Sequence, residues 1–184
     1  MNNLQILAIS GSLRTISSNL AGLQAAKILA APAIDITLYT GLANLPHFNP
    51  DLDCEPFPQE VIALRQQIQS SEGIIISIPE YAHGVPGSFK NALDWLVSSS
   101  EFPGKPVAVI NTNPRATIAL SSLREILVTM SAQIIEPANL TLNLAGKGLD
   151  AAGIIADAEL STALRKALSL FATAILEINH HKNT

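Results

Sequence analysis

The chain has 184 residues, of which 48% are hydrophobic and 14% are charged, so its composition is typical of one folded domain and excludes a disordered protein. The formal net charge of −4 argues against nucleic acid or an anionic membrane as a partner, because both require basic patches, and the single cysteine excludes an internal disulfide. No apolar segment approaches the ~20 residues that span a bilayer and the first residues lack the pattern of a signal peptide, so we expect a cytoplasmic protein with no membrane partner.

Short β-branched runs alternate with longer helical patterns along the chain. The candidate strands are apolar runs at residues 4–9, 34–39, 73–78, 106–110 and 140–144. The candidate helices carry apolar residues at helical spacing and span residues 19–31, 59–69, 88–97, 118–131 and 156–178, with Asn19 as the expected N-cap of the first. Residues 41–58 contain four prolines and are expected to form a loop, and residues 179–184 are expected to be a frayed tail of a single domain that spans residues 1–184.

This alternation predicts an α/β fold, a three-layer, doubly wound sheet of five parallel strands with right-handed crossovers. For one domain of this length we expect the flavodoxin-like strand order 2-1-3-4-5. Ligands of such sheets bind at the carboxyl ends of the strands, where the loops after strands 1 and 3 flank the point at which the strand order reverses. The loops that follow residues 4–9 and 73–78 are therefore the first places to look for a site.

The first of these loops is rich in hydrogen-bond donors. The side chains of Ser10, Ser12, Ser17 and Asn19 can each donate to a phosphate oxygen, and Arg14 adds a positive charge with a planar fork suited to phosphate. The free N–H groups at the start of the following helix favour an anion at the same place. The loop lacks the lysine of a triphosphate-binding loop and the three glycines of a dinucleotide-binding loop, so a monophosphate fits better. The alternative is a capped turn with a solvated arginine, which the sequence of this loop explains about equally well.

The second loop follows an uninterrupted apolar run. Pro79 ends this run, and Glu80, Tyr81 and Ala82 follow as candidates for contact with a flat ring system through their backbone groups and the aromatic face of Tyr81. His83 is a candidate for substrate binding or proton transfer, although a solvated loop histidine is the commoner case. Further on, Lys90 and Asp94 have the spacing of a surface ion pair on a helix. Trp95 is expected in the core or at a subunit contact.

Two motifs in these loops resemble those of the NAD(P)H-dependent FMN reductase family, which includes quinone, azo-dye and chromate reductases. The first loop reads GSLRxxSxN from Gly11 to Asn19, and the second segment reads PEYxHGxPGxxKNAxDW from Pro79 to Trp95. The resemblance implies a flavodoxin-like fold with the phosphate of FMN held at Ser12, Arg14, Ser17 and Asn19 and its ring over residues 79–82. It also implies a homodimer or homotetramer, with an interface role for Trp95 and its helix.

The chain departs from the family pattern at two places. Ala82 stands where the family usually has asparagine, which removes one side-chain hydrogen bond near the ring. The loop after the fourth strand, residues 111–117, reads NTNPRAT where the family usually has a Ser- and Gly-rich stretch that approaches the flavin closely. We include Asn113 of this loop among the candidate cofactor-binding residues and consider Arg115 a candidate contact for a phosphate of the nicotinamide nucleotide.

The leading hypothesis is an FMN-dependent oxidoreductase. It uses NADPH or NADH as reductant and a small-molecule electron acceptor, such as a quinone or azo compound, and it needs no catalytic side-chain acid or base because the flavin supplies the chemistry. The alternative is an FMN-binding protein, a redox sensor or carrier, with little turnover. A phosphoester hydrolase on the same fold is less favoured, because no nucleophile–base pair or carboxylate cluster accompanies the first loop. We expect no metal site and no nucleic-acid partner.

Overall fold

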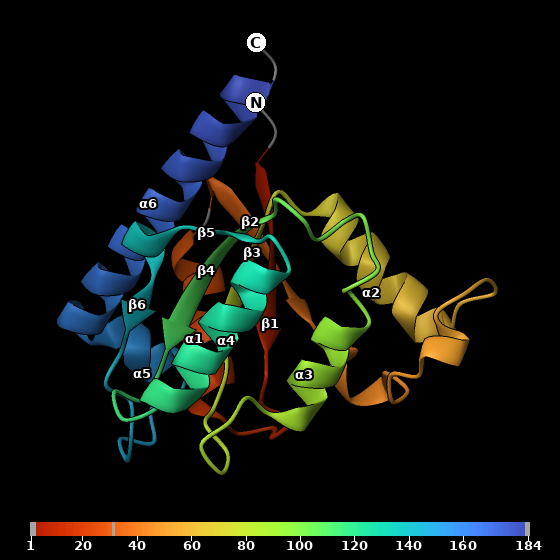
Figure 1. The fold of residues 1–184 in the computed structure, drawn as a ribbon. Helices are drawn as coiled ribbons and strands as arrows, with labels where there is room; N and C mark the ends of the chain where they lie inside the picture. The colour runs from red at the N-terminus through yellow and green to blue at the C-terminus, as the bar shows by residue number, and fades with distance from the viewer. Residues whose placement is uncertain (1–2, 31, 183–184) are drawn as a thin grey trace.

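The computed structural model describes residues 3–30 and 32–182 and has a parallel sheet between two layers of helices (Figure 1). The strands are β1 (Leu4–Ser10), β2 (Ile34–Tyr39), β3 (Gly73–Ser77), β4 (Pro106–Asn111), β5 (Gln133–Ile134) and β6 (Leu140–Thr141). The helices are α1 (Ser18–Ala30), α2 (Gln59–Ser70), α3 (Gly87–Asp94), α4 (Thr117–Thr129), α5 (Ala151–Ala156) and α6 (Ala158–Lys182). The strand order β2-β1-β3-β4-β5 is the expected one, so the flavodoxin-like, doubly wound prediction is confirmed.

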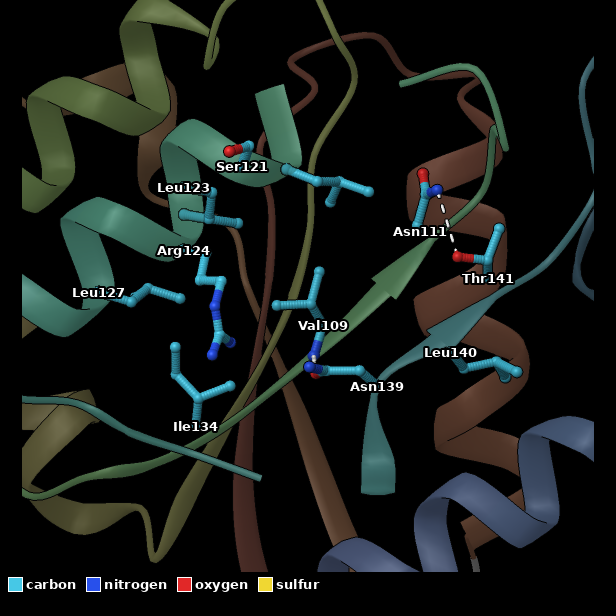
Figure 2. Close-up of a pocket in the computed structure, with 11 residues that line it drawn as sticks. Val109, Asn111, Ser121, Leu123, Arg124, Leu127, Ile134, Asn139, Leu140 and Thr141 are labelled. Carbon is cyan, nitrogen blue, oxygen red and sulfur yellow. Dashed lines mark hydrogen bonds between the residues drawn. The ribbon is translucent and has the colours of Figure 1, made fainter. Parts of the chain in front are cut away.

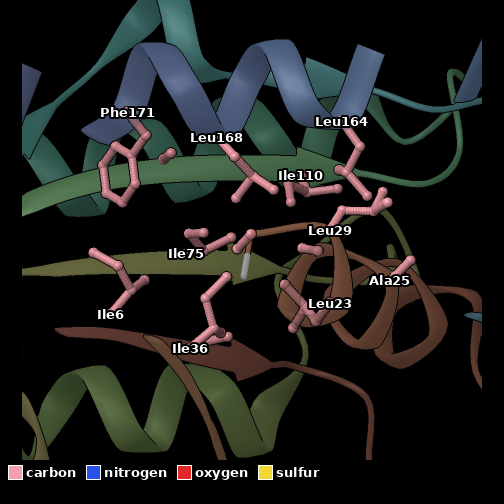
Figure 3. Close-up of a cluster of buried hydrophobic side chains, with 14 of the residues drawn as sticks. Ile6, Leu23, Ala25, Leu29, Ile36, Ile75, Ile110, Leu164, Leu168 and Phe171 are labelled. Atoms are coloured by element: carbon pink, nitrogen blue, oxygen red, sulfur yellow. The ribbon is translucent and has the colours of Figure 1, made fainter. Parts of the chain in front are cut away.

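One face of the sheet is covered by α1, α5 and α6. Ile6, Ile36 and Ile75 point from three adjacent strands toward Leu23 of α1 and Phe171 of α6 (Figure 3). At the start of β3, Gly73 allows α6 to approach, because a Cβ built there would lie 2.6 Å from Cδ1 of Ile175. The absence of a side chain at this position therefore sets how closely the last helix packs on the sheet.

The expected last helix differs from the observed structure at both ends. The segment expected as helix 156–178 is preceded by the short α5, and Asp157 separates the two helices by accepting hydrogen bonds from the backbone N–H of Glu159 and Leu160. At the other end, α6 continues to Lys182, so residues 179–182 are helical and the prediction of a frayed tail was wrong for them. Ala31, the last residue of the expected first helix, lies outside the described residues.

The other face of the sheet is covered by α2, α3 and α4. Trp95, which directly follows α3, is fully buried, packs edge to face on Phe48 with ring centroids 5.1 Å apart, and donates from Nε1 to the carbonyl of Pro46. Asn91 holds the same loop, because its side chain donates to the Pro46 carbonyl and accepts from the N–H of Phe48. The tryptophan is therefore a core residue that fixes the proline-rich loop, which is the first of the two places expected for its side chain.

The edge of the sheet beyond β4 is broken. The expected fifth strand at residues 140–144 is present only as Leu140–Thr141, and the preceding β5 was not predicted. Between the two, the side chain of Asn139 takes the place of a strand backbone and accepts from the N–H of Val109 at 2.8 Å (Figure 2). Pro137 lies in the short turn that separates β5 from β6, and proline cannot donate to a ladder. The break leaves a cavity of about 340 Å³ beside α4.

Candidate functional site

A pocket of about 190 Å³ lies at the carboxyl ends of β1, β3 and β4, where all three following loops meet. The residues that line it come from the first loop, the second loop, the loop after β4 and the segment after β6: Ser12, Arg14, Ser17, Ser18, Asn19, Ile78, Pro79, Glu80, Tyr81, Thr112, Asn113 and Ala145. This is the edge at which doubly wound sheets bind their ligands. The pocket therefore brings together the first and second loops, which are about sixty residues apart in the sequence. It also includes the loop after β4, whose position the two motifs alone did not predict.

The first loop is shaped by its own hydroxyl groups. Ser17 caps α1, because its Oγ accepts from the N–H of Leu20 at 3.3 Å, so the expectation that Asn19 is the N-cap was wrong. Ser12 Oγ accepts from the N–H of Arg14 at 3.3 Å, and its residue is 9% exposed. Since both serine oxygens act as acceptors here, their hydroxyl protons remain to be donated to a ligand.

Gly11 brings the first loop against the end of β3. Its N–H donates to the carbonyl of Ser77 at 2.8 Å, and a Cβ built on it would lie 2.7 Å from Cγ2 of Ile78. Its φ is not in the left-handed region, so the glycine is needed for this close approach and not for an unusual turn. The two loops that form the pocket are thus held in contact at their bases.

The second loop ends in a tight turn with two non-glycine residues in the left-handed region. Ala82 has φ of 48° and His83 has φ of 58°, and Tyr81 and Gly84 pair through both backbone hydrogen bonds, at 3.2 and 2.9 Å. Each such residue costs about 1–2 kcal/mol, and asparagine tolerates this conformation better than alanine. The N–H and C=O of Tyr81 are used by the turn, so they are not the groups that pair with a ligand in this conformation.

The Glu80 side chain joins the second loop to α4. Its Oε2 accepts from the N–H of Ala119 at 2.8 Å, and its Oε1 lies 3.2 Å from Nδ1 of His83. Ala116, the residue at the N-cap of α4, offers no side-chain acceptor, so a carboxylate from another loop caps this helix. The hydrogen bond from Ala119 lowers the pKa of Glu80, and the contact with His83 lowers it further. Both carboxylate oxygens of Glu80 therefore have partners in the protein, which makes Glu80 a cap of α4 in this structure, and His83 remains exposed beside it.

The loop after β4 is held by hydrogen bonds within itself. Asn111 donates from Nδ2 to the carbonyl of Asn113 at 2.9 Å and accepts from its N–H at 3.1 Å, while Asn113 Oδ1 accepts from the N–H of Arg115. This places Asn113 on the wall of the pocket, whereas Arg115 is exposed and is not among the lining residues. Asparagine side chains supply the turn geometry that glycines supply in other loops, because they mimic backbone hydrogen bonds.

Asn19 offers the pocket a donor that the protein leaves unused. The residue is 4% exposed, and its Nδ2 is buried without a hydrogen-bond partner. A buried donor left unpaired costs about 1–3 kcal/mol, so a ligand oxygen at this position would be stabilised strongly. Together with the hydroxyls of Ser12 and Ser17 and the charge of Arg14, this donor set fits a phosphate monoester, and the one carboxylate that lines the pocket, that of Glu80, is turned to α4.

Most of the residues proposed from the sequence line this one pocket. They are Ser12, Arg14, Ser17, Asn19, Pro79, Glu80, Tyr81 and Asn113. Ser10 and Ala82 are not among the lining residues; the hydroxyl of Ser10 instead bonds to the backbone of Ser12. Sequence reasoning missed Ser18, Ile78, Thr112 and Ala145. Thr112 lies within the loop 111–117 that was singled out, whereas nothing in the sequence marks Ala145, which follows β6.

The described residues support neither a metal site nor a membrane-spanning helix. Residues 3–30 and 32–182 contain no cluster of three or more histidine, cysteine, aspartate or glutamate residues that could hold a metal ion. Over the same part of the chain, no helix is long and apolar enough to cross a membrane. The expected ion pair between Lys90 and Asp94 is present on α3.

Comparison with known proteins gives one consistent result. The family model described as NADPH-dependent FMN reductase matches residues 4–147. An NAD(P)H-dependent FMN reductase of Pseudomonas aeruginosa is 32% identical over 161 residues, which cover 85% of this chain and 86% of the relative. A quinone reductase of Escherichia coli is 35% identical over 138 residues, 71% of this chain and 73% of the relative. The solved structure of FerB, a flavoenzyme NAD(P)H:(acceptor) oxidoreductase of Paracoccus denitrificans, superimposes with a TM-score of 0.84 at 27% identity and covers 95% of this chain and 98% of that one.

Proposed function

The chain belongs to the NADPH-dependent FMN reductase family, and from this premise we propose that it is an NAD(P)H-dependent FMN oxidoreductase that reduces a quinone, an azo compound or a similar small acceptor. The observation that carries the proposal is the pocket at the carboxyl edge of the sheet, in which a buried amide donor, two hydroxyls and an arginine converge. FMN supplies the hydride chemistry when it is bound, since it accepts a hydride from NADH or NADPH and returns the electrons to an acceptor.

The residues of this chain bind and orient the cofactor in the proposed scheme. Ser12, Ser17 and Asn19 donate hydrogen bonds to the phosphate, and Arg14 offsets its charge against the negative field of the whole protein. Pro79 and Tyr81 line the same pocket on the side of the second loop, where they offer apolar and aromatic surface to a flat ring. Arg115, which is exposed two residues after the lining residue Asn113, is the proposed contact for a phosphate of the nicotinamide nucleotide.

The scheme requires no proton transfer by a side chain. Glu80, the only carboxylate among the lining residues, is committed to the N-terminus of α4 and its pKa is lowered, so it does not serve as an acid or base near neutral pH. Its function in the proposed enzyme is to fix the second loop against α4. This agrees with a reaction in which the cofactor does the chemistry and the protein supplies position and electrostatics.

We also propose that the protein forms a homodimer or homotetramer in the cytoplasm. Support for self-association comes from large apolar side chains that remain exposed on α4 and the second loop: Ile118 at 49%, Val128 at 55% and Tyr81 at 51%. Light scattering coupled to gel filtration measures the mass directly. A monomer at micromolar concentration would remove the oligomer from the proposal and leave the reductase activity untouched.

The decisive test starts from purified protein mixed with excess FMN and then freed of unbound flavin. We expect a yellow protein whose flavin absorbance bleaches when NADPH or NADH is added under argon and returns when a quinone is added. Steady-state oxidation of the reduced nucleotide with a quinone acceptor then measures turnover. A protein that retains no flavin would refute the proposal at its first step.

The same measurements separate the enzyme from a redox sensor or carrier. A protein that binds FMN tightly but is not reduced by either nucleotide would be a flavin-binding protein with little turnover. The relatives named as reductases favour the enzyme. Riboflavin, which lacks the phosphate, serves as the control ligand, because it reports whether the first loop contributes to binding.

A further inference from the structure

Thr112 is buried at the carboxyl end of β4, lines the pocket and is hydrogen-bonded to Asn19 of the first loop. Its Oγ1 donates to Oδ1 of Asn19 at 2.7 Å, across 93 residues of sequence. The two residues are 3% and 4% exposed, so this is a hydrogen bond shielded from water. Because the carbonyl oxygen of the Asn19 amide is occupied, its NH₂ group is the end left for a ligand, and that group has no partner in the protein.

Two contacts fix the position of Thr112 and hence of its hydroxyl. The backbone carbonyl of Thr112 accepts from the N–H of Leu144 at 3.1 Å, which ties the residue to the segment after β6. The Cγ2 methyl lies over Gly22 of α1, since a Cβ built on that glycine would be 3.4 Å from it. A β-branched side chain has few χ1 rotamers, so a seated methyl also determines where the hydroxyl points.

We propose that Thr112 is a positioning residue for the phosphate site: by donating to the Asn19 carbonyl oxygen it holds the amide with its NH₂ group toward the pocket, and so sets a preference for the phosphorylated flavin over riboflavin. The inference rests on the proposed binding of FMN. An amide without this hydrogen bond can rotate by half a turn at little cost, because its oxygen and nitrogen are nearly the same size. The hydroxyl of Thr112 could also accept from the NH₂ group of a rotated amide, but that amide presents an oxygen to the phosphate, which repels it. With FMN bound, the hydroxyl therefore donates to Oδ1 and stabilises the orientation that binds.

The arrangement also explains a feature of the loop after β4. Its sequence lacks the Ser- and Gly-rich stretch of the family, yet Thr112 connects it directly to the first loop, and Asn113 beside it lines the pocket. The loop therefore contributes to phosphate binding through the orientation of Asn19, in addition to forming a wall.

The experiment compares the dissociation constants of FMN and riboflavin for the wild-type protein and two variants. Thr112→Val removes the hydroxyl and keeps the shape, and Thr112→Ser keeps the hydroxyl. We expect Thr112→Val to weaken FMN binding by about five- to tenfold, the range expected when one hydrogen bond to a buried polar group is lost, and to leave riboflavin binding unchanged. Thr112→Ser should restore FMN binding to within about twofold of wild type.

A second pair of variants tests whether Thr112 acts through Asn19. Asn19→Ala alone should weaken FMN binding, and the double variant with Thr112→Val should bind FMN no more weakly than Asn19→Ala, because the amide that Thr112 orients is gone. Additive losses in the double variant would show that Thr112 acts by another route. If Thr112→Val unfolds, Thr112→Ala removes the same hydroxyl with less volume and carries the same expectations.

The outcomes distinguish this inference from the proposed function. A loss shared equally between FMN and riboflavin would mean that Thr112 only packs the loop, and no loss for either ligand would mean that the hydrogen bond is dispensable; both results overturn the inference while FMN binding stands. A wild-type protein that binds neither flavin would instead refute the proposed function.

Discussion

The cavity beside α4 and the pocket at the carboxyl edge of the sheet differ in whether their polar side chains have hydrogen-bond partners in the protein. The cavity beside α4 has about 340 Å³ and the pocket at the carboxyl edge about 190 Å³, so the larger one is not the candidate site. At the sheet edge, the polar side chains of Asn111, Asn139, Thr141 and Arg124 are hydrogen-bonded to other parts of the chain. At the carboxyl edge, Asn19 keeps a buried donor without a partner.

The difference makes the pocket at the carboxyl edge the stronger candidate, because a ligand can satisfy an unpaired buried donor and volume alone offers no such group. The edge cavity results from a strand that proline interrupts, and Asn139 repairs the missing backbone hydrogen bond. The pocket at the carboxyl edge is maintained at the cost of a buried unpaired donor and two strained residues in the second loop. Costs of this kind persist in proteins where a function requires them.

The largest expected effect concerns stability at the sheet edge. Leu123 lines the edge cavity and is 1% exposed, so Leu123→Ala enlarges an existing void and should lower the free energy of unfolding by about 2–5 kcal/mol. We expect the dissociation constant of FMN to stay within about twofold of wild type, because no lining residue of the flavin pocket changes. Urea unfolding and fluorescence titration measure the two quantities. A large loss of FMN affinity in a still-folded variant would show that the cavity and the pocket are coupled.

Arg14→Ala should lower the affinity for FMN and leave the stability of the fold nearly unchanged, which is the reverse of Leu123→Ala. Loss of a charged phosphate contact is expected to weaken FMN binding by at least about tenfold, with little change in stability, because Arg14 is exposed. Arg124→Ala is the matched control: it removes an arginine of the edge cavity and its ion pair with Glu136, and should leave FMN binding unchanged. Equal effects of the two substitutions would indicate a general effect of net charge and remove Arg14 from the site.

Glu80→Gln tests how the pocket depends on pH. Because the folded pKa of Glu80 lies below its ordinary value of 4.5, its carboxylate stabilises the fold fully above about pH 4.5, and this contribution is lost as the pH falls through the lowered pKa. Glu80→Gln should therefore melt at a lower temperature than wild type at neutral pH, and the two melting temperatures should converge as the pH falls below the lowered pKa. Glu125→Gln, at an exposed position of α4, is the control. A constant difference in melting temperature at every pH would contradict a role for the charge.

Ala82→Gly has the smallest expected effect. Relief of the left-handed strain at Ala82 is partly offset by the greater freedom of glycine in the unfolded chain, so we expect a gain of about 0.5 kcal/mol in the free energy of unfolding. Ser131, with φ of 60° at the end of α4, lies outside the pocket and provides the comparison substitution Ser131→Gly. Thermal melting of both variants measures the effect. Destabilisation by Ala82→Gly would show that the strain is not present in solution.

The fold could be predicted because the patterns that indicate it, apolar runs and helical spacing, are contained in short stretches of sequence. The apolar runs that became β1 to β4 and the helical patterns of α1 to α4 were recognised within two residues of their observed ends, except that α3 ends three residues earlier than expected. The edge strand was not, because two residues of β5 and two of β6 carry too little pattern to be distinguished from a loop. The separate α5 and the extension of α6 were also missed, since Asp157 looks like an ordinary helix residue until its side chain is seen capping the next helix.

The candidate site was predictable in outline. Motifs identified the first two loops, and the rule for doubly wound sheets placed them together. The roles of individual residues were less accessible: the N-cap is Ser17 and not Asn19, Glu80 caps a helix from a distant loop, and Trp95 belongs to the core. Each of these roles depends on a partner far away in the sequence, and no spacing rule contains that information.

The amino-acid sequence by itself determined the class of fold, the two loops of the candidate site and the family, because these follow from hydrophobic periodicity and from short motifs whose members are close neighbours in the chain. Only the tertiary structure decided which polar atoms remain free to bind. A donor is available or occupied according to what lies within about 3 Å of it. For Asn19 the deciding atom is the hydroxyl of Thr112, which the fold brings to within 2.7 Å from 93 residues away.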